Sequence, residues 1–408
     1  MTDVILILNA GSSSIKFAVY PLGATAAPLI RGKIADIERD PVFSAIGADG
    51  TAIDMDMPKG IGATADHETL VSMLLGWLAQ QRGDRTLAAV GHRVVHGGRR
   101  FAAPVLIDNA VLGELEQLIP LAPLHQPHSL AAIRAISRLE PTLPQVACFD
   151  TSFHRTQDRL AQLFALPREL SDEGIIRYGF HGLSYEYIAS VLPEHLGDRA
   201  EGRVIVAHLG NGASMCAMKN RQSVATSMGF TALDGLMMGQ RCGTLDAGVV
   251  LYLLQSKGLS ATEIETLLYR RSGLLGVSGI SNNMQDLERC DDPRAREAIE
   301  LFCFRAASVL GGLVTVLGGL DAVVFTAGIG ENSALVRKMI CERLAHLGVE
   351  LEPGCNESGA LRISTAQSSI DVLVIPTDEG AVIANATSET VAHSPAHNKL
   401  SKLTSVGT

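Results

Sequence analysis

The sequence lacks the features of a secreted, membrane or nucleic-acid-binding protein. Its seven cysteines are odd in number, scattered and without a Cys-x-x-Cys pair, which is typical of a reduced cytoplasmic protein. The N-terminus carries Asp3 where a signal peptide has basic residues. With 34 basic against 43 acidic side chains, the net charge of −9 makes the chain a poor binder of polyanions. We therefore expect a cytoplasmic protein with no nucleic-acid or membrane partner.

Long hydrophobic runs and the common nucleotide signatures are missing too. The most apolar segment, 306–320, ends at Asp321 and contains four glycines, whereas a membrane span needs about 20 apolar residues, so we expect a buried helix. There is no G-x-x-x-x-G-K-[ST], no G-x-G-x-x-G and no H-R-D motif. P-loop, Rossmann and protein-kinase folds therefore lose their main support.

Two segments about 200 residues apart share one plan of strand, Gly/Ser turn and strand: 4–20 and 204–218. Each predicts a β-hairpin whose small-residue loop would let an anion approach backbone N–H groups, although either alone could be an ordinary turn. Around them, strands alternate with helices, which predicts two mixed α/β halves. The strands are expected at 86–95, 145–149, 321–327 and 370–376, and the helices at 67–81, 109–119 and 293–317. The segment 41–62 could be an excursion or flap.

Polar residues gather where these strands end, which is where open α/β folds bind ligands. Three glycine-rich turns could line a polyphosphate, with Lys16, Arg93 and Arg241 neutralising it. Mg²⁺ takes one or two protein oxygens, for which Asn9, Asp150 and Glu379 are candidates. This combination favours phosphoryl transfer.

Other interpretations compete for several of these residues. His92 and His96 are four apart, but they lie in a strand-to-turn stretch rather than on a helix, which disfavours zinc. His125 and His128 could each bond a carbonyl group. Asp150 could equally cap the next segment.

Taken together, the ordered motifs are highly specific. They are N-A-G-S-S-S-x-K (9–16), G-H-R-V-V-H-G-G (91–98), F-D-T-x-F-H (149–154), R-Y-G-F-H-G (177–182), H-L-G-N-G-A-S (208–214) and A-G-I-G-E-N (327–332). From Val4 to about Asn385 the chain resembles the acetokinase (acetate kinase) family of the sugar kinase, Hsp70 and actin superfamily.

The resemblance implies an α/β protein with a duplicated two-domain actin-like ATPase (RNase H-like) fold and a cleft between the domains. The first domain would be 1–150, completed by a C-terminal helix at about 380–392, and the second 151–379. Residues 393–408 would form a loose tail. Family members are homodimers.

The resemblance also assigns site residues. Asp150, His181 and Arg241 would be catalytic, and Arg93 would bind the substrate beside an apolar pocket of Val95, Leu124, Phe180 and Ala232. Mg²⁺, which Mn²⁺ can replace, would lie at Asn9 and Glu379. ATP or ADP would contact Lys16, His208, Leu209, Gly210, Asn211, Gly212, Asn283, Met284, Gln285, Gly328, Ile329, Gly330, Glu331 and Asn332.

The chain departs from the family pattern in four places. Gln126 replaces an asparagine, and Asn282–Gln285 replaces a Ser-Asp-x-Arg pattern near the nucleoside. Gly380 replaces a second glutamate, and Ala232 a proline of the acetate pocket. One methylene in such a pocket is worth about 1–3 kcal/mol, so propionate is an expected secondary substrate.

The expected reaction is reversible, Mg²⁺-dependent, in-line transfer of the γ-phosphoryl group of ATP to acetate, giving acetyl phosphate and ADP. Acetate is ionised near neutral pH and needs no general base, so we expect Asp150 to orient an arginine or metal-bound waters. The alternatives are pyrophosphate as donor, a non-metabolic Hsp70-like or actin-like ATPase, and a sugar kinase.

Overall fold

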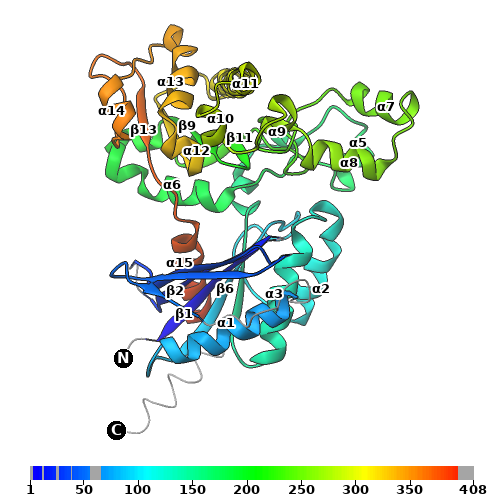
Figure 1. The fold of residues 1–408 in the computed structure, drawn as a ribbon, viewed down its shortest axis with the longest axis vertical. Coiled ribbons are helices and arrows are strands. Elements are labelled where there is room, and N and C mark those ends of the chain that lie inside the picture. The colour runs from blue at the N-terminus through cyan, green and yellow to red at the C-terminus, as the bar shows by residue number, and fades with distance from the viewer. Residues whose placement is uncertain (1–2, 12, 24–26, 38, 56–65, 394–408) are drawn as a thin grey trace. The chain divides into compact units, whose positions relative to one another are not determined.

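The structure is a computed structural model that describes residues 3–11, 13–23, 27–37, 39–55 and 66–393. The chain divides into two compact units. Unit 1 runs to Ser152 and takes up the chain again at Asp378, and unit 2 is Phe153–Thr377 (Figure 1). Of the expected tail, 394–408 lies outside the described residues, as does Ser12 of the first glycine-rich motif.

The sheet of unit 1 has the strand order β5-β4-β3-β2-β1-β6-β8-β7. Its strands are β1 (Val4–Ala10), β2 (Ser14–Pro21), β3 (Ile30–Ala35), β4 (Val42–Gly47), β5 (Ala52–Ile53), β6 (Leu87–Val94), β7 (Val105–Leu106) and β8 (Gln145–Phe149). The predicted first hairpin is confirmed, because β1 and β2 pair antiparallel. The segment 41–62 does not form a flap over its described part, because β4 and β5 extend the sheet; 56–62 lies outside the described residues.

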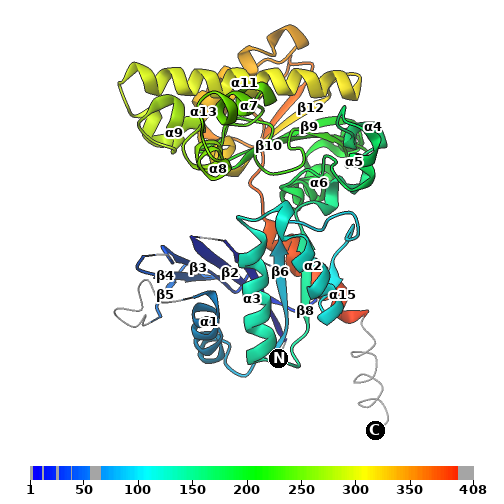
Figure 2. The same cartoon turned by 90° about the vertical axis from the view of Figure 1, so that its right-hand side faces the viewer.

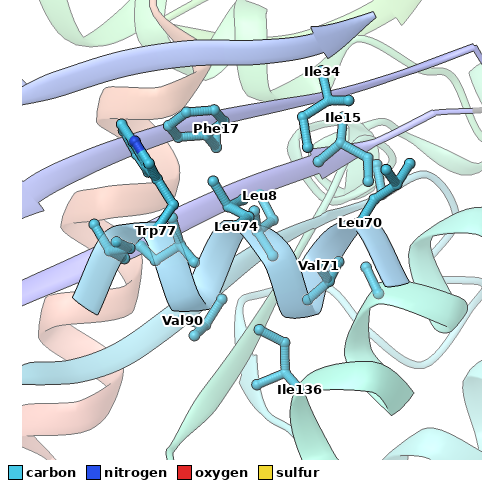
Figure 3. Packing of buried hydrophobic residues seen from close by; sticks show 14 of the residues in the cluster. Leu8, Ile15, Phe17, Ile34, Leu70, Val71, Leu74, Trp77, Val90 and Ile136 are labelled. Atoms are coloured by element: carbon cyan, nitrogen blue, oxygen red, sulfur yellow. The ribbon is translucent and has the colours of Figure 1, made fainter. Parts of the chain in front are cut away.

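Helices cover both faces of this sheet. They are α1 (His67–Gln81), α2 (Asn109–Gln117), α3 (Gln126–Leu139) and α15 (Glu379–Ala392). Because successive strand side chains point to opposite faces, Leu6 and Leu8 lie in one cluster with Leu70 and Leu74 of α1. Trp77 extends that cluster toward Phe17 of β2 (Figure 3).

Helix α15 packs against β6 on the opposite face. A Cβ atom at Gly91 would lie 2.3 Å from Oγ1 of Thr387 and 2.7 Å from a methyl group of Ile383, so the helix reaches its place only because residue 91 is glycine. The expected helix at about 380–392 begins at Glu379. Glu379 therefore belongs to unit 1. The domain boundaries expected from the sequence instead place it at the end of the second domain, 151–379.

Unit 2 contains a smaller sheet with the order β11-β10-β9-β12-β13. Its strands are β9 (Arg203–Leu209), β10 (Ala213–Lys219), β11 (Gln222–Thr226), β12 (Ala322–Thr326) and β13 (Asp371–Val374). The neighbours β11, β10 and β9 pair antiparallel, and β12 and β13 then continue the sheet parallel to β9. In unit 1 the strands β3-β2-β1-β6-β8 have the same order of antiparallel and parallel pairs. The predicted duplication is thus present in the strand topology.

The longest helices of unit 2 lie on opposite faces of this sheet. Tyr185, Ile188 and Leu192 of α6 pack on Val204 and Val206, whereas α11 contacts β9, β10 and β11 (Figure 2). The helices are α4 (Arg159–Gln162), α5 (Arg168–Asp172), α6 (Gly182–Leu196), α7 (Ala247–Gln255), α8 (Ala261–Arg270), α9 (Gly273–Ser278), α10 (Met284–Glu288), α11 (Pro293–Leu317), α12 (Ala327–Asn332), α13 (Ala334–Glu342) and α14 (Pro353–Ser358).

Helix α11 is the one described helix that is long and apolar enough to cross a membrane by length and composition. Core helices of globular proteins have the same length and composition, so this one helix is weak evidence for a membrane span. Its buried face, from Ala295 to Leu317, packs on unit 2, as expected for this segment.

Candidate functional site

In unit 1, the parallel strands bring the predicted polar residues to one edge of the sheet. Asn9, Arg93 and Asp150 stand at the carboxyl ends of β1, β6 and β8, which are neighbours in the sheet. Glu379 joins them as the first residue of α15. The edge therefore combines residues that lie far apart in the sequence.

Arg93 is the centre of this group. Its Nε donates to Oδ1 of Asp150 at 3.0 Å and its Nη2 to Oδ2 at 2.5 Å, while Nη1 donates to Oδ1 of Asn9 at 3.1 Å. Oε2 of Glu379 lies 4.0 Å from Nε. A guanidinium group has five N–H donors, so one remains on each terminal nitrogen. This pair has the spacing that binds a carboxylate or phosphoryl group with two hydrogen bonds.

Negative charge exceeds positive charge around Arg93. Burial, together with the nearby carboxylate of Glu379, raises the pKa of Asp150 to about 6, although Arg93 acts in the opposite direction. The two carboxylates in turn raise the pKa of Arg93, despite its burial. Two carboxylates and an amide oxygen beside one guanidinium suit a hard, oxygen-binding cation such as Mg²⁺. Asn9 and Glu379 thus fit the predicted metal role.

The other predicted groups of unit 1 lie near this edge in the sheet or its loops. Lys16 is exposed on β2 directly opposite Asn9. Val95 is buried just after β6, and Leu124 is half-buried. Gln126 is fully buried: its side chain accepts from the backbone N–H of His96 at 3.1 Å and donates to the carbonyl of the same residue at 3.2 Å. Gln126 therefore braces the backbone next to Val95, a role that its sequence position did not reveal.

In unit 2, His181 and Arg241 converge on the glycine-rich turn between β9 and β10. A Cβ atom at Gly212 would lie 3.3 Å from Nε2 of His181 and 4.0 Å from Nη1 of Arg241. The position of the Arg241 side chain is fixed by a hydrogen bond, because Nη1 also donates to the carbonyl of Ala232 at 3.1 Å. Two donors thus border the space above Gly212 that the missing side chain leaves.

His208 supports this arrangement from below. Its ring stacks on that of His181 with centroids 4.2 Å apart, and its Nδ1 lies 2.8 Å from Oγ of Ser184. His208 and Leu209 are buried in β9. His208 is thus placed to hold the His181 ring.

A cavity of about 480 Å³ lies in unit 2 beside this turn. Three distant segments line it, and eight of the predicted nucleotide residues are among the lining: Gly210, Asn211, Asn283, Met284, Gln285, Gly328, Ile329 and Asn332. Sequence reasoning missed Glu288 and Ser333, which also line it. Glu288 follows Met284 by four residues on α10, so helical spacing was the signal that could have found it.

The A-G-I-G-E-N motif that follows β12 forms a short helix, α12, rather than a glycine-rich turn. The carboxylate of Glu331 turns inward and accepts from the backbone N–H groups of Ala327 at 2.7 Å and Thr377 at 3.3 Å. Glu331 and the buried Gly330 are not among the cavity lining. Ala327 has φ of 65°, a left-handed conformation that costs a non-glycine residue energy and is frequent at functional sites.

The four residues of the predicted apolar pocket fall in both units. Val95 and Leu124 belong to unit 1, and Phe180 and Ala232 to unit 2. Phe180 is buried, and Ala232 is half-buried. The predicted catalytic residues are divided in the same way, with Asp150 in unit 1 and His181 and Arg241 in unit 2.

Comparison with known proteins identifies the family. The model of the acetokinase family matches residues 4–385. The chain belongs to the acetokinase family. A curated acetate kinase of Rhodopseudomonas palustris (strain ATCC BAA-98 / CGA009) is 55% identical over 391 residues, covering 94% of this chain and 97% of its own.

Two solved structures agree with this membership. A propionate kinase from Francisella tularensis subsp. tularensis SCHU S4 has a TM-score of 0.88 at 37% identity, covering 95% of this chain and 99% of its own. The acetate kinase of Porphyromonas gingivalis has a TM-score of 0.85 at 34% identity, covering 95% and 100%. Acetokinases have the actin-like ATPase fold, so the fold class predicted from the motifs is confirmed.

Proposed function

We propose that this acetokinase is an acetate kinase: it transfers the γ-phosphoryl group of ATP to acetate, reversibly, giving acetyl phosphate and ADP. The observation that carries the proposal is the nucleoside-sized cavity beside Gly212, where His181 and Arg241 converge. High identity to curated acetate kinases over nearly the whole chain supports it.

The residues divide the work by charge. The two remaining N–H groups of Arg93 bind the acetate carboxylate, with Val95, Leu124, Phe180 and Ala232 around its methyl group. His181 and Arg241 donate to the transferring phosphoryl group, whose negative charge is spread over its equatorial oxygens in the transition state. Mg²⁺, or Mn²⁺ in its place, supplies charge neutralisation at the phosphates when held by Asn9 and Glu379.

Asp150 orients Arg93 and does not remove a proton. Acetate is already ionised near neutral pH, so the forward reaction needs no general base. The bidentate pair with Arg93 directs both carboxylate oxygens of Asp150 toward the guanidinium group, as expected of an orienting residue. A sugar kinase must deprotonate a hydroxyl group and would instead require Asp150 as a base.

The cavity favours a nucleotide over pyrophosphate as the donor. Pockets of 300–1,000 Å³ accommodate molecules the size of a nucleoside, whereas a pyrophosphate donor would leave this space unused. The lining side chains of Asn283, Gln285 and Asn332 are neutral amides suited to a base or sugar.

Trapping of acyl phosphate with hydroxylamine tests the proposal. Purified protein is assayed with acetate, propionate, butyrate or glucose against ATP, GTP or pyrophosphate, with Arg241→Ala as the control for contaminating kinases. We expect acetyl hydroxamate with ATP, a smaller yield from propionate, and loss of signal in the variant. No acyl hydroxamate with any pair overturns the proposal.

We further propose that the protein works in the cytoplasm as a homodimer, as the family resemblance implies. Helix α7 supports a dimer, because none of its residues is buried although its sequence is mainly apolar.

A further inference from the structure

The His181 side chain sits on a strained backbone, and its environment is defined at one ring face and at both ring nitrogens. With φ of 58°, His181 precedes α6 in the left-handed region, which non-glycine residues rarely adopt. Its ring stacks on His208, its Nδ1 lies 2.8 Å from Oγ of Ser214, and its Nε2 faces the space above Gly212. Such strain is retained where the position of a side chain matters.

Ser214 connects His181 to a second hydroxyl group. The hydroxyl oxygen of Tyr185 lies 2.5 Å from Oγ of Ser214, and both side chains are fully buried. Burial raises the pKa of Tyr185 well above its ordinary value, so the phenol keeps its proton. Tyr185 comes from α6 and Ser214 from β10, so two elements fix the geometry.

The hydrogens available on the two hydroxyl groups fix the direction of the hydrogen bonds from Tyr185 through Ser214 to His181. Ser214 is the hydrogen-bond partner of the Tyr185 hydroxyl, and a buried hydroxyl hydrogen without an acceptor carries the full penalty of desolvation. Tyr185 must therefore donate to Ser214. The single hydrogen of Ser214 then points to Nδ1 of His181, which has to accept it. A neutral imidazole that accepts at Nδ1 carries its proton on Nε2.

We propose that Tyr185 and Ser214 are positioning residues: their hydroxyl groups form a one-way chain, Tyr185 to Ser214 to His181, that keeps the His181 proton on Nε2, where it can be donated to the transferring phosphoryl group. The inference rests on the proposed function for the identity of the acceptor. The direction of the chain follows from the hydrogen bonds alone. His208 stacks on the His181 ring, and Nη1 of Arg241 borders the same space above Gly212 as Nε2 of His181.

Nitrogen NMR of ¹⁵N-histidine-labelled protein tests the direction, at about pH 8 where an imidazole is mostly neutral. The His181 signals are assigned by their loss in His181→Gln. We expect a protonated Nε2 and an unprotonated Nδ1 in the wild type and in Ser214→Thr, which keeps the hydroxyl group. Ser214→Ala should give mixed tautomers, and Tyr185→Phe an intermediate spectrum.

Kinetics test the consequence. In Ser214→Ala, kcat should fall about tenfold with KM within about twofold, less than the 10²–10³-fold loss on removing a transition-state donor outright. Ser214→Thr should restore most of kcat. The control is Tyr178→Phe, which removes another buried hydroxyl group of unit 2, one that donates to the carbonyl of Gly174 at 2.9 Å. It should leave both the His181 spectrum and kcat unchanged.

A wild-type His181 protonated on Nδ1, or a Ser214→Ala protein with wild-type spectrum and kcat, overturns the inference. If Ser214→Ala does not fold, Tyr185→Phe and Ser214→Thr give the same comparison. Because the spectrum needs no substrate, a protein without acyl-phosphate activity but with the expected tautomer contradicts the proposed function and leaves the hydrogen-bond direction established.

Discussion

At the scale of single residues, protein groups hold both of the proposed arginines in place. Asp150 occupies one edge of Arg93 and leaves one N–H group on each terminal nitrogen. Arg241 donates from Nη1 to the carbonyl of Ala232. Fixing a donor before the substrate arrives lowers the reorganisation that the reaction requires.

Replacing Arg241 by Ala should mainly lower kcat, by roughly 10²-fold or more, because its charge is needed when negative charge develops on the phosphoryl group. Steady-state kinetics with varied ATP and acetate measure the effect. An unchanged kcat with a raised KM would instead make Arg241 a residue that binds the ground state.

Asp150 and Arg93 should behave as one unit. If Asp150 acts by orienting Arg93, Asp150→Asn adds little to the loss already caused by Arg93→Ala, so the two effects on kcat/KM are strongly non-additive. A double-mutant cycle measures this. Additive losses would show that Asp150 has a separate role, such as proton transfer.

At the scale of secondary-structure elements, a buried cation ties α12 to its neighbours. The Arg337 side chain is 1% exposed. It donates to the carbonyls of Gly330 and Glu331 at 2.9 and 2.8 Å, and to the side chain of Asn356 at 2.8 Å. These contacts hold the segment that lines the cavity.

Replacing Arg337 by Met should raise KM for ATP more than KM for acetate and lower stability, because each buried carbonyl left without a donor costs about 1–3 kcal/mol. Substrate-dependent kinetics and urea unfolding are the measurements. The matched control is Arg343→Met, because Arg343 is exposed at the C-terminal end of α13, the helix that also contains Arg337. Equal changes in the two KM values would mean that α12 does not set nucleotide affinity.

The packing of α15 against β6 at Gly91 is a second feature at the scale of secondary-structure elements. A methyl group at position 91 would overlap Thr387 and Ile383, so Gly91→Ala should destabilise unit 1 by about 1–3 kcal/mol. Gly76→Ala, on α1 where nothing lies within 4 Å of an added Cβ, is the control and should not destabilise. Urea unfolding compares them; equal midpoints would mean that α15 can shift at no cost.

At the scale of the whole molecule, two units of like topology each contribute part of the proposed chemistry. Unit 1 supplies Arg93, Asp150, Asn9 and Glu379, and unit 2 the cavity with His181 and Arg241. Either unit alone lacks groups that the reaction calls for.

The dimer expectation belongs to this scale. Light scattering should give twice the 43.2 kDa mass of one chain. Leu251 and Tyr252 of α7 are both 53% exposed, so Leu251→Glu with Tyr252→Glu should shift the protein toward monomer. Leu160→Glu, at a residue 86% exposed in α4, is the control. A monomeric wild type would contradict the expectation.

The sequence by itself determined the fold class, both hairpins, the strands β6, β8, β12 and β13 and the helices α1, α2 and α11, whereas helices such as α3 and α6 were not predicted. It could do so because their signals are local: apolar periodicity marks α1 and α11, and buried five-residue runs mark β8 and β12. The motif set also determined the family. The sequence did not reveal β4 and β5, because short strands whose side chains are mostly exposed or half-buried lack the apolar pattern of a buried strand.

Only the tertiary structure decided how the named side chains are used. It directed the carboxylate of Glu331 inward to backbone N–H groups, made Gln126 a brace for His96, and added Glu288 and Ser333 to the cavity. It also joined Tyr185 to His181 through Ser214, which lies 29 positions after Tyr185 in the sequence. Such contacts depend on where distant segments meet and which way each hydrogen points. Neither the meeting of distant segments nor the direction of a hydrogen bond produces a periodic pattern in the sequence.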